Sequence, residues 1–288
     1  MSQDTSPHYQ FIRLEHRGPV SWIVLNRPRQ SNALSNGLLD EFSDALAYLA
    51  DNGGPVLAIR GEGRGFSAGY DIGEVGKADS YGSLQADPIQ DHARLRRNVG
   101  RYLAIWDHPK PIIAAIHGYC MAGATQMSSY ADITIVTDDA RIGVPTIPIG
   151  GGYVTPLWVP LVGPKRAKEL SFVPGNSIDG RMAVEWGWAN HSVPEGKLIE
   201  AVESMAARIA LTPPDVLRIK KLSINRAAEA AGARRAADAG SEMDALLHLA
   251  PSVVQLKQEL SRDGLKETIR RFHCERTTDL SEQYRDKD

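Results

Sequence analysis

The sequence predicts an α/β fold in which strands and helices alternate before a long helical region follows. Three observations support this. Short apolar runs alternate with helical spacings over the first two thirds of the chain, two glycine-rich loops each follow such a run, and the sequence from about residue 177 is helical almost throughout. The 288 residues, 42% of them hydrophobic, are enough for a full core, either as one large domain or as a domain with an appendage.

The elements of the first half follow in order from their patterns. Residues 11–17 and 20–26 predict a hairpin around "RGP", and 35–51 has helical spacing, with Ser35 or Asn36 as its cap. The buried stripe of that helix comprises Leu38, Leu39, Phe42, Leu46 and Leu49. The further expected elements are a strand at 55–61, a glycine loop at 61–72, a polar stretch from 73 to about 90, a helix at 92–107 and a buried strand at 110–118.

The second half begins with a glycine turn and becomes helical. The segment "GYCMAGATQM" (118–127) leads from the buried strand into a small-residue helix, and 131–144 contributes further strands. Helices are expected at 155–163, 164–173, 179–189, 195–211, 213–249 and 252–272. We place a spiral α/β core at residues 1–195 and a helical region at 196–288.

Charge and composition exclude several functions. The net charge of −2 leaves no electrostatic footprint for nucleic acid, and no run approaches the roughly 18 apolar residues of a membrane span. The start is polar, without the apolar core of a signal peptide, and the two cysteines, Cys120 and Cys274, support no disulfide framework. We therefore expect a cytoplasmic protein that binds neither membrane nor nucleic acid and uses no metal.

The two glycine loops, 63–72 and 118–127, are the candidate chemical site. A strand-to-helix turn leaves the first helical N–H groups without carbonyl partners, and these groups can hold an anion or a developing oxyanion. Two such loops that meet would supply one N–H each. The alternative is that both glycine sets only form tight turns. A dinucleotide loop at "RGEGRG" is disfavoured because no amphipathic helix follows it at once.

Ordered blocks of the sequence resemble the crotonase superfamily, the enoyl-CoA hydratase/isomerase family. They are "WIVLNRPRQSNALSNGLLDEF" (22–42), "GRGFSAGYDI" (63–72) and "KPIIAAIHGYCMAGATQMSSYADITIV" (110–136), and the similarity continues into 162–198. The resemblance covers roughly residues 10–275. It implies a crotonase-like spiral of ββα units with a C-terminal helical trimerisation region, assembled as a homotrimer or a dimer of trimers.

The resemblance also implies an acyl-CoA thioester as the ligand, with coenzyme A as part of the substrate and no separate cofactor. The backbone N–H groups of Tyr70 and Gly123 would bind the thioester oxygen. Coenzyme A would contact residues of two loops and one C-terminal arginine: Arg29, Gln30, Ala68, Tyr70, Asp71, Ile72 and Arg271.

The sequence departs from its relatives at both catalytic carboxylates. Hydratases of the family use one glutamate three residues past the second oxyanion glycine and another twenty residues further on. Here these positions are Gln126 and Thr146. An amide and a hydroxyl orient water but do not titrate usefully near pH 7. Ordinary hydration is therefore doubtful, and both residues are expected to shape or hydrogen-bond the acyl end.

Other side chains remain possible bases. His92, beside Asp91, lies on the segment that covers the acyl pocket in such proteins, although adjacent residues do not face each other on a helix. Tyr153 follows three consecutive glycines and could direct its hydroxyl into the pocket. Three functions stay open: a lyase or isomerase acting through a thioester enolate, a C–C bond hydrolase or decarboxylase acting on a CoA thioester, and a non-catalytic acyl-CoA-binding subunit.

Overall fold

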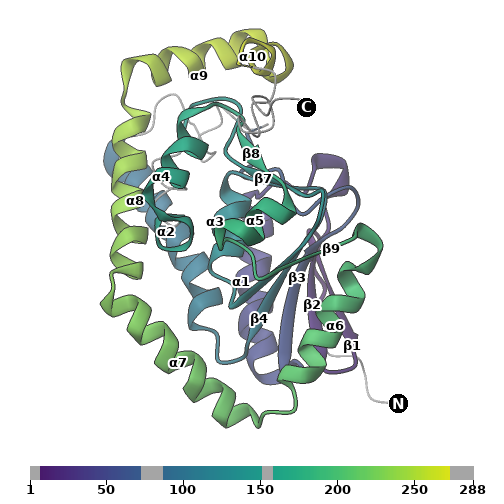
Figure 1. Cartoon of the computed structure of the whole chain (residues 1–288). Helices are drawn as coiled ribbons and strands as arrows, with labels where there is room; N and C mark the ends of the chain where they lie inside the picture. The colour runs from purple at the N-terminus through teal and green to yellow at the C-terminus, as the bar shows by residue number, and fades with distance from the viewer. Residues whose placement is uncertain (1–6, 73–86, 151–157, 273–288) are drawn as a thin grey trace, which may run out of the picture.

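Two sheets form the framework of the chain, whose computed structural model describes residues 7–72, 87–150 and 158–272 (Figure 1). The larger sheet has the strand order β1-β2-β3-β4-β6-β9. Its strands are β1 (Ile12–Arg17), β2 (Val20–Leu25), β3 (Val56–Gly61), β4 (Ile112–Ile116), β6 (Ile133–Thr137) and β9 (His191–Val193). Only the β1–β2 hairpin is antiparallel; the other pairs of this sheet are parallel.

The smaller sheet gives the chain its spiral course. It has the order β5-β7-β8, formed by β5 (Tyr119–Met121), β7 (Arg141–Gly143) and β8 (Ser177–Ile178). The chain passes from β4 into β5 and then into helix α3 (Gly123–Ser129), so one ββα unit contributes a strand to each sheet. It then returns through β6 to the larger sheet and through β7 to the smaller one. This is the ββα spiral that the sequence predicts.

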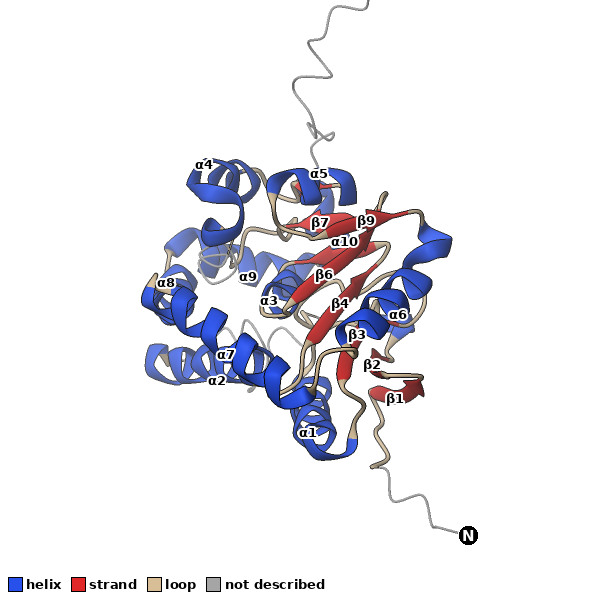
Figure 2. Ribbon diagram, turned by 60° about the horizontal axis from the view of Figure 1, so that its bottom comes forward, coloured by secondary structure: helices blue, strands red, loops and turns tan. Residues whose placement is uncertain are grey.

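Both faces of the larger sheet are buried, which explains its almost continuous apolar strands. Alternate residues along β2 face opposite layers: Ile23 and Leu25 pack against the main core, while Trp22 and Val24 pack against α6 (Leu198–Ile209). Helix α1 (Asn36–Asn52) covers the opposite face with its predicted stripe, and Ser35 caps it by accepting a hydrogen bond from Leu38 N–H. Figure 2 shows the sheet between these helices.

Four helices at the end of the described chain wrap around the core (Figure 1). They are α7 (Pro214–Ala230), α8 (Ala233–His248), α9 (Pro251–Asp263) and α10 (Leu265–Arg271). Helix α8 packs along α2 (Pro88–Asp107), and the apolar side of α9 covers Ile147 and Ile149. Lys221 fixes α7 to the core, because its Nζ lies 2.7 Å from Asp132 Oδ2 and donates to the carbonyls of Ile105 and Lys110.

The sequence prediction was wrong in four places. Residues 252–272 form two helices, α9 and α10, rather than one, because Gly264 adopts a φ of 83° between them. β8 and β9 interrupt the region from residue 177 that was expected to be helical almost throughout. Residues 213–249 form two helices rather than one, because Gly232 adopts a φ of 103° at the start of α8. Helix α2 begins at Pro88, inside the expected polar stretch, where Asp87 caps it by accepting from Ile89 N–H.

The remaining described helices connect the layers. They are η1 (Pro28–Gln30), α4 (Val159–Phe172), α5 (Gly180–Trp186) and η3 (Glu195–Lys197). Within the described ranges, no helix combines the length and apolar character that crossing a membrane requires.

Candidate active site

The two glycine loops meet at one edge of the larger sheet. They follow β3 and β4, which are parallel neighbours, so their carboxyl ends lie side by side. Backbone hydrogen bonds then join the loops directly: Phe66 N–H donates to His117 O at 3.0 Å, Ser67 N–H to Tyr119 O at 3.1 Å, and Met121 N–H to Ser67 O at 3.0 Å. The two loops are therefore hydrogen-bonded directly to each other, although about 50 residues separate them in the sequence.

The structure brings Tyr70 and Gly123 together where these loops meet. A Cβ on Gly69, whose φ is 92°, would lie 3.2 Å from Gly123 N and 2.6 Å from Met121 O. A Cβ on Gly123 would lie only 2.6 Å from Cε2 of the Tyr70 ring. Both positions therefore require glycine, because real Cβ atoms essentially never come this close to another heavy atom. Because Gly69 and Gly123 carry no Cβ, the two loops approach closely enough for residues 70 and 123 to be neighbours.

The turn into α3 is strained at the residue before Gly123. Ala122, the N-cap of α3, has a φ of 51° and a ψ of −122°, which L-residues rarely adopt. Its N–H donates to Gly143 O at 2.9 Å, so the smaller sheet holds it in this conformation. Such strain concentrates at functional sites. Gly123 is the first residue of α3, where an N–H has no intrahelical acceptor.

Beside the loops lies a buried polar group that the sequence does not reveal. Tyr70 Oη donates to Oε1 of the fully buried Gln126 at 3.1 Å. Tyr102 of α2, also fully buried, lies close by; burial raises the pKa of its hydroxyl, and the Tyr70 side chain opposes that increase. The Tyr70 backbone thus belongs to the first glycine loop, while the Tyr70 hydroxyl bonds the side chain of Gln126.

Thr146 is half-buried just beyond β7, next to the turn at residue 175. A Cβ on Gly175 would lie 3.0 Å from Thr146 Oγ1, and Gly175 N–H donates to Pro145 O at 3.1 Å. Ile147 and Ile149, two and four residues after Pro145, are covered by α9. The segment that carries Thr146 is therefore held by the C-terminal helices as well as by the core.

The predicted nucleotide loop is joined to the first glycine loop. Leu34 N–H donates to Gly69 O at 2.8 Å and Ala68 N–H to Ser31 O at 3.0 Å, which brings the η1 segment beside residues 68–70. Arg29, Gln30 and Ala68 are exposed there, and Ile72 is half-buried. An accessible basic side chain thus lies on the same surface as the glycine loop.

Asn32 organises this junction and was missed by the sequence analysis. Its side chain is buried and makes three bonds to backbone groups: Nδ2 donates to Glu62 O at 2.9 Å and Gly65 O at 3.0 Å, and Oδ1 accepts from Arg27 N–H at 2.9 Å. Its φ of 52° is the left-handed conformation that asparagine tolerates. An asparagine in "QSNAL" is the only signal the sequence offers.

Asp71 pairs with Arg27, and Asp91 does not pair with its neighbour His92. Arg27 Nη1 lies 2.8 Å from Asp71 Oδ2. Asp91 Oδ2 instead lies 2.6 Å from Nδ1 of the buried His248 on α8. Burial alone would raise the pKa of Asp91, but His248 and Arg94 outweigh it and lower that pKa to about 2. His92 is half-buried, and its buried Nε2 has no hydrogen-bond partner among the described residues.

Arg271 makes no hydrogen bond or ion pair with the glycine loops among the described residues, and Tyr153 lies outside those residues. Arg271 lies on α10, where its Nη1 is 2.9 Å from Glu259 Oε2 on α9. Their proposed roles as phosphate ligand and base stay predictions.

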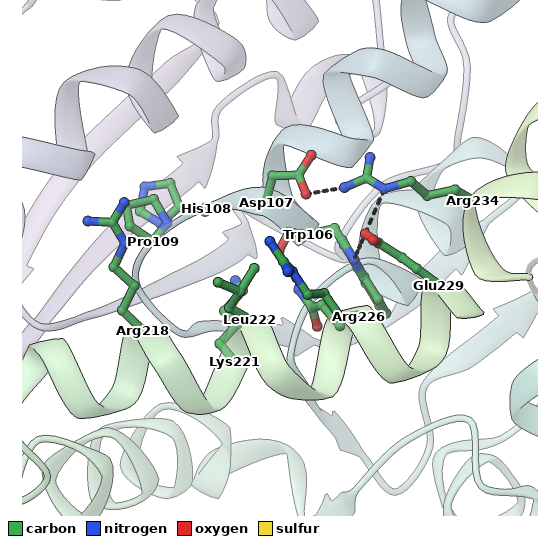
Figure 3. A pocket seen from close by; sticks show the side chains of 11 residues that line it. Trp106, Asp107, His108, Pro109, Arg218, Lys221, Leu222, Arg226, Glu229 and Arg234 are labelled. Atoms are coloured by element: carbon green, nitrogen blue, oxygen red, sulfur yellow. Dashed lines mark hydrogen bonds and ion pairs between the residues drawn. The ribbon is translucent and has the colours of Figure 1, made fainter. Parts of the chain in front are cut away.

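A separate cavity of about 370 Å³ lies between the end of α2 and α7 (Figure 3). Arg234 bridges Asp107 and Glu229 at its wall, and Glu229 also accepts from Trp106 Nε1 at 3.3 Å. None of the glycine-loop residues lines it. In the described ranges, no group of three or more His, Cys, Asp or Glu side chains could hold a metal ion.

Comparison with known proteins agrees with this geometry. A family model described as Enoyl-CoA hydratase/isomerase matches residues 15–252. Two relatives are a short-chain-enoyl-CoA hydratase of Clostridium acetobutylicum, 30% identical over 75% of this chain and 81% of its own, and a hydroxycinnamoyl-CoA hydratase-lyase of Pseudomonas fluorescens, 28% identical over 77% and 80%.

Solved structures extend the similarity over the whole fold. A Novosphingobium aromaticivorans protein assigned to the same family superposes with a TM-score of 0.90 and 47% identity, covering 96% of this chain and 99% of its own. An enoyl-CoA hydratase/isomerase of Xanthobacter autotrophicus gives 0.84 and 31%, over 92% and 98%. The predicted crotonase-like fold is therefore confirmed, and the chain belongs to the enoyl-CoA hydratase/isomerase family of the crotonase superfamily.

Proposed function

We propose that the protein binds an acyl-CoA thioester and stabilises its enolate with the N–H groups of Tyr70 and Gly123. The contact between Gly69 and Gly123 carries this proposal, because it puts the residues that bear both donors side by side. An N–H pair of this kind stabilises charge that develops only along the reaction path, so it accelerates the reaction instead of merely binding substrate. Arg29 and the exposed backbone around Ala68 would receive the coenzyme A portion.

Ordinary hydration is not the reaction we propose. Gln126 is fully buried and accepts a hydrogen bond from Tyr70, so it is an established part of the core rather than a free acid or base. Thr146 supplies only a hydroxyl. Hydration requires one group that deprotonates water and another that delivers a proton to the α-carbon. Neither residue can take the first role near pH 7.

The experiment is a turnover assay on enoyl-, β-keto- and malonyl-type CoA thioesters, with products identified by mass spectrometry. We expect binding of CoA esters and no rapid hydration of crotonyl-CoA. The double variant Gln126→Glu/Thr146→Glu should raise hydration above background, since it restores both carboxylates. Rapid hydration by the unaltered protein would refute our inference that Gln126 and Thr146 cannot do the work of the two glutamates. Absence of heat with every CoA ester in calorimetry would refute thioester binding itself.

We also propose that the chain assembles as a homotrimer or a dimer of trimers. Helix α7 exposes Ile219 and Ile224, α8 exposes Met243 and Leu246, and Leu249 directly after α8 is exposed too, each residue with about half or more of its surface accessible. Exposed apolar side chains on two successive helices are consistent with contacts to other copies of the chain. Light scattering should give three or six times the chain mass of 31.4 kDa; the monomer mass would contradict the proposal.

A further inference from the structure

We propose that the cavity between the end of α2 and α7 binds a small, elongated dianion between Arg218 and Arg226. The ligand class is two carboxylates joined by an apolar chain. Figure 3 shows the two arginines extending from α7 on either side of Leu222. None of the glycine-loop residues lines this cavity, so the inference goes beyond the proposed function and does not depend on it.

The acidic side chains of the cavity wall already have cationic partners. Arg234 bridges Asp107 and Glu229, its Nε lying 2.6 Å from Glu229 Oε1. Lys221, which also lines the cavity, has its Nζ 2.7 Å from Asp132 Oδ2. Among the described residues of the lining, no carboxylate is therefore left to neutralise a further cation.

The neutral polar groups of the wall are also engaged. His108 Nδ1 accepts from Lys110 N–H at 3.1 Å, and Nε2 lies 3.2 Å from Leu46 O. Burial lowers the pKa of His108 to about 4, so the ring carries no charge at pH 7. Asn225 Nδ2 donates to Trp106 O at 2.8 Å. These groups hold α2 and α7 in place and do not compete for a ligand.

Arg218 and Arg226 differ from the other charged side chains of the wall. Neither takes part in an ion pair or hydrogen bond within the described ranges, and both are exposed. A guanidinium stays charged at any physiological pH and presents a fork of donors that matches a carboxylate. Once the pairs above are set aside, these two groups supply the positive charge that remains in the described lining.

The spacing of the two arginines determines the shape of the ligand. Residues 218, 222 and 226 follow one another at intervals of four, so they lie along one side of α7. Eight residues of an α-helix span about 12 Å, which is too far for one small anion to contact both backbone positions closely. Leu222 lies between the arginines, and Trp106 and Pro109 line the same cavity from the end of α2. The middle of the ligand should therefore be apolar and its two ends anionic.

The size of the cavity favours a small molecule. Its volume of about 370 Å³ lies at the lower end of the range of roughly 300–1,000 Å³ that ligand pockets occupy. A medium-chain dicarboxylate such as suberate meets the requirements of charge, length and size together. A nucleotide would bring polar groups along its whole length, where the cavity offers Leu222 and Trp106.

The test measures binding by calorimetry, with the full chain in the assembly that it forms and at constant ionic strength. Suberate should bind. Succinate is too short to reach both arginines, and octanoate has the apolar chain but a single carboxylate. Each should bind about 3–10-fold more weakly than suberate, the loss expected for one exposed but bidentate guanidinium–carboxylate pair.

Substitutions then assign the two ends. Arg218→Met and Arg226→Met each keep an apolar stem and remove the guanidinium, so each should weaken suberate about 3–10-fold and octanoate less. Lys220→Met is the matched control, because Lys220 is an exposed cation of α7 that does not line the cavity. It should leave suberate binding unchanged. Urea denaturation should give all three variants the stability of the unaltered protein, since these side chains are exposed.

Three results would overturn the inference. One is the absence of heat with suberate. Another is inorganic phosphate or octanoate binding as tightly as suberate, which would mean that the arginines attract single anions separately. The third is an equal loss in Lys220→Met, which would reduce the effect to the general charge of α7. Each leaves thioester binding at the glycine loops untouched, so it does not bear on the proposed function.

Discussion

Replacing Gly69 by alanine should separate the two loops that carry the proposed oxyanion donors. The new Cβ would lie 2.6 Å from Met121 O, 2.8 Å from Ala122 Cβ and 3.2 Å from Gly123 N. These neighbours are backbone or short side chains that cannot rotate away, so the loop at 121–123 must move. The Gly123 N–H would therefore move by a few tenths of an ångström or more.

The expected magnitude has two parts. A left-handed residue other than glycine costs about 1–2 kcal/mol, and overpacking of a tight contact costs about 1–3 kcal/mol. Gly69→Ala should therefore lower the free energy of unfolding by about 2–5 kcal/mol. Losing one oxyanion donor lowers turnover by about 10²–10³-fold in enzymes that depend on such a pair.

Gly232→Ala is the matched control. Its φ is 103°, also left-handed, but nothing lies within 4 Å of the position a Cβ would occupy. This variant measures the backbone strain alone, so it should lose about 1–2 kcal/mol and keep thioester binding. Urea denaturation measures stability, and calorimetry with butyryl-CoA measures binding. Equal stability losses in both variants, with binding unchanged in Gly69→Ala, would refute the argument that the loop contact builds the site.

Two predictions concern stability. The folded-state pKa of Asp91, lowered to about 2, lies below its ordinary value of 3.8, so its contribution is present above pH 4 and is lost as the pH falls towards 2. Allowing for screening by solvent, Asp91→Asn should lower the free energy of unfolding by about 1–2 kcal/mol at pH 6, and by progressively less below pH 4. Urea denaturation at each pH measures this difference, and a difference that does not change with pH would contradict the prediction. Lys221→Met should lower the free energy of unfolding by about 3–5 kcal/mol, because it leaves Asp132 buried without its charged partner. Adding Asp132→Asn should recover part of this loss. If it recovers nothing, packing rather than charge holds α7.

The sequence predicted the elements whose signals are local. The stripe of α1, the hairpin of β1 and β2 and the apolar runs of β3 and β4 follow from periodicity and turn residues. The short strands were missed because two or three residues carry too little pattern: β8 has two residues and β9 three. They exist because neighbouring strands offer hydrogen-bond partners, and that information lies elsewhere in the chain.

In the site, too, some features could be predicted from the sequence and others could not. The meeting of the two glycine loops could be predicted, because both follow parallel strands and the family resemblance orders them. The partners of individual side chains could not. Asp91 is adjacent to His92 in sequence, yet its partner is His248, 157 residues away, because a helix directs neighbouring residues to different sides. The bond between Tyr70 and Gln126 spans 56 residues and depends on the path of both loops.

Backbone donors and side-chain bases respond differently to substitution, and this explains why the site is still recognisable. The N–H groups of residues 70 and 123 are present with any side chain except proline, provided that Gly69 and Gly123 keep the loops in contact. The carboxylates of the hydratases are side chains, and the positions where the resemblance places them are Gln126 and Thr146 in this chain. If the proposed backbone donors are kept, the reaction can change through the side chains that move protons, and this is what we infer for Gln126 and Thr146. In this chain Tyr70 bears one proposed oxyanion donor on its backbone and a hydroxyl that bonds Gln126. Tyr70→Phe therefore tests the side chain alone, while a variant that moves the loops, such as Gly69→Ala, tests the backbone donors.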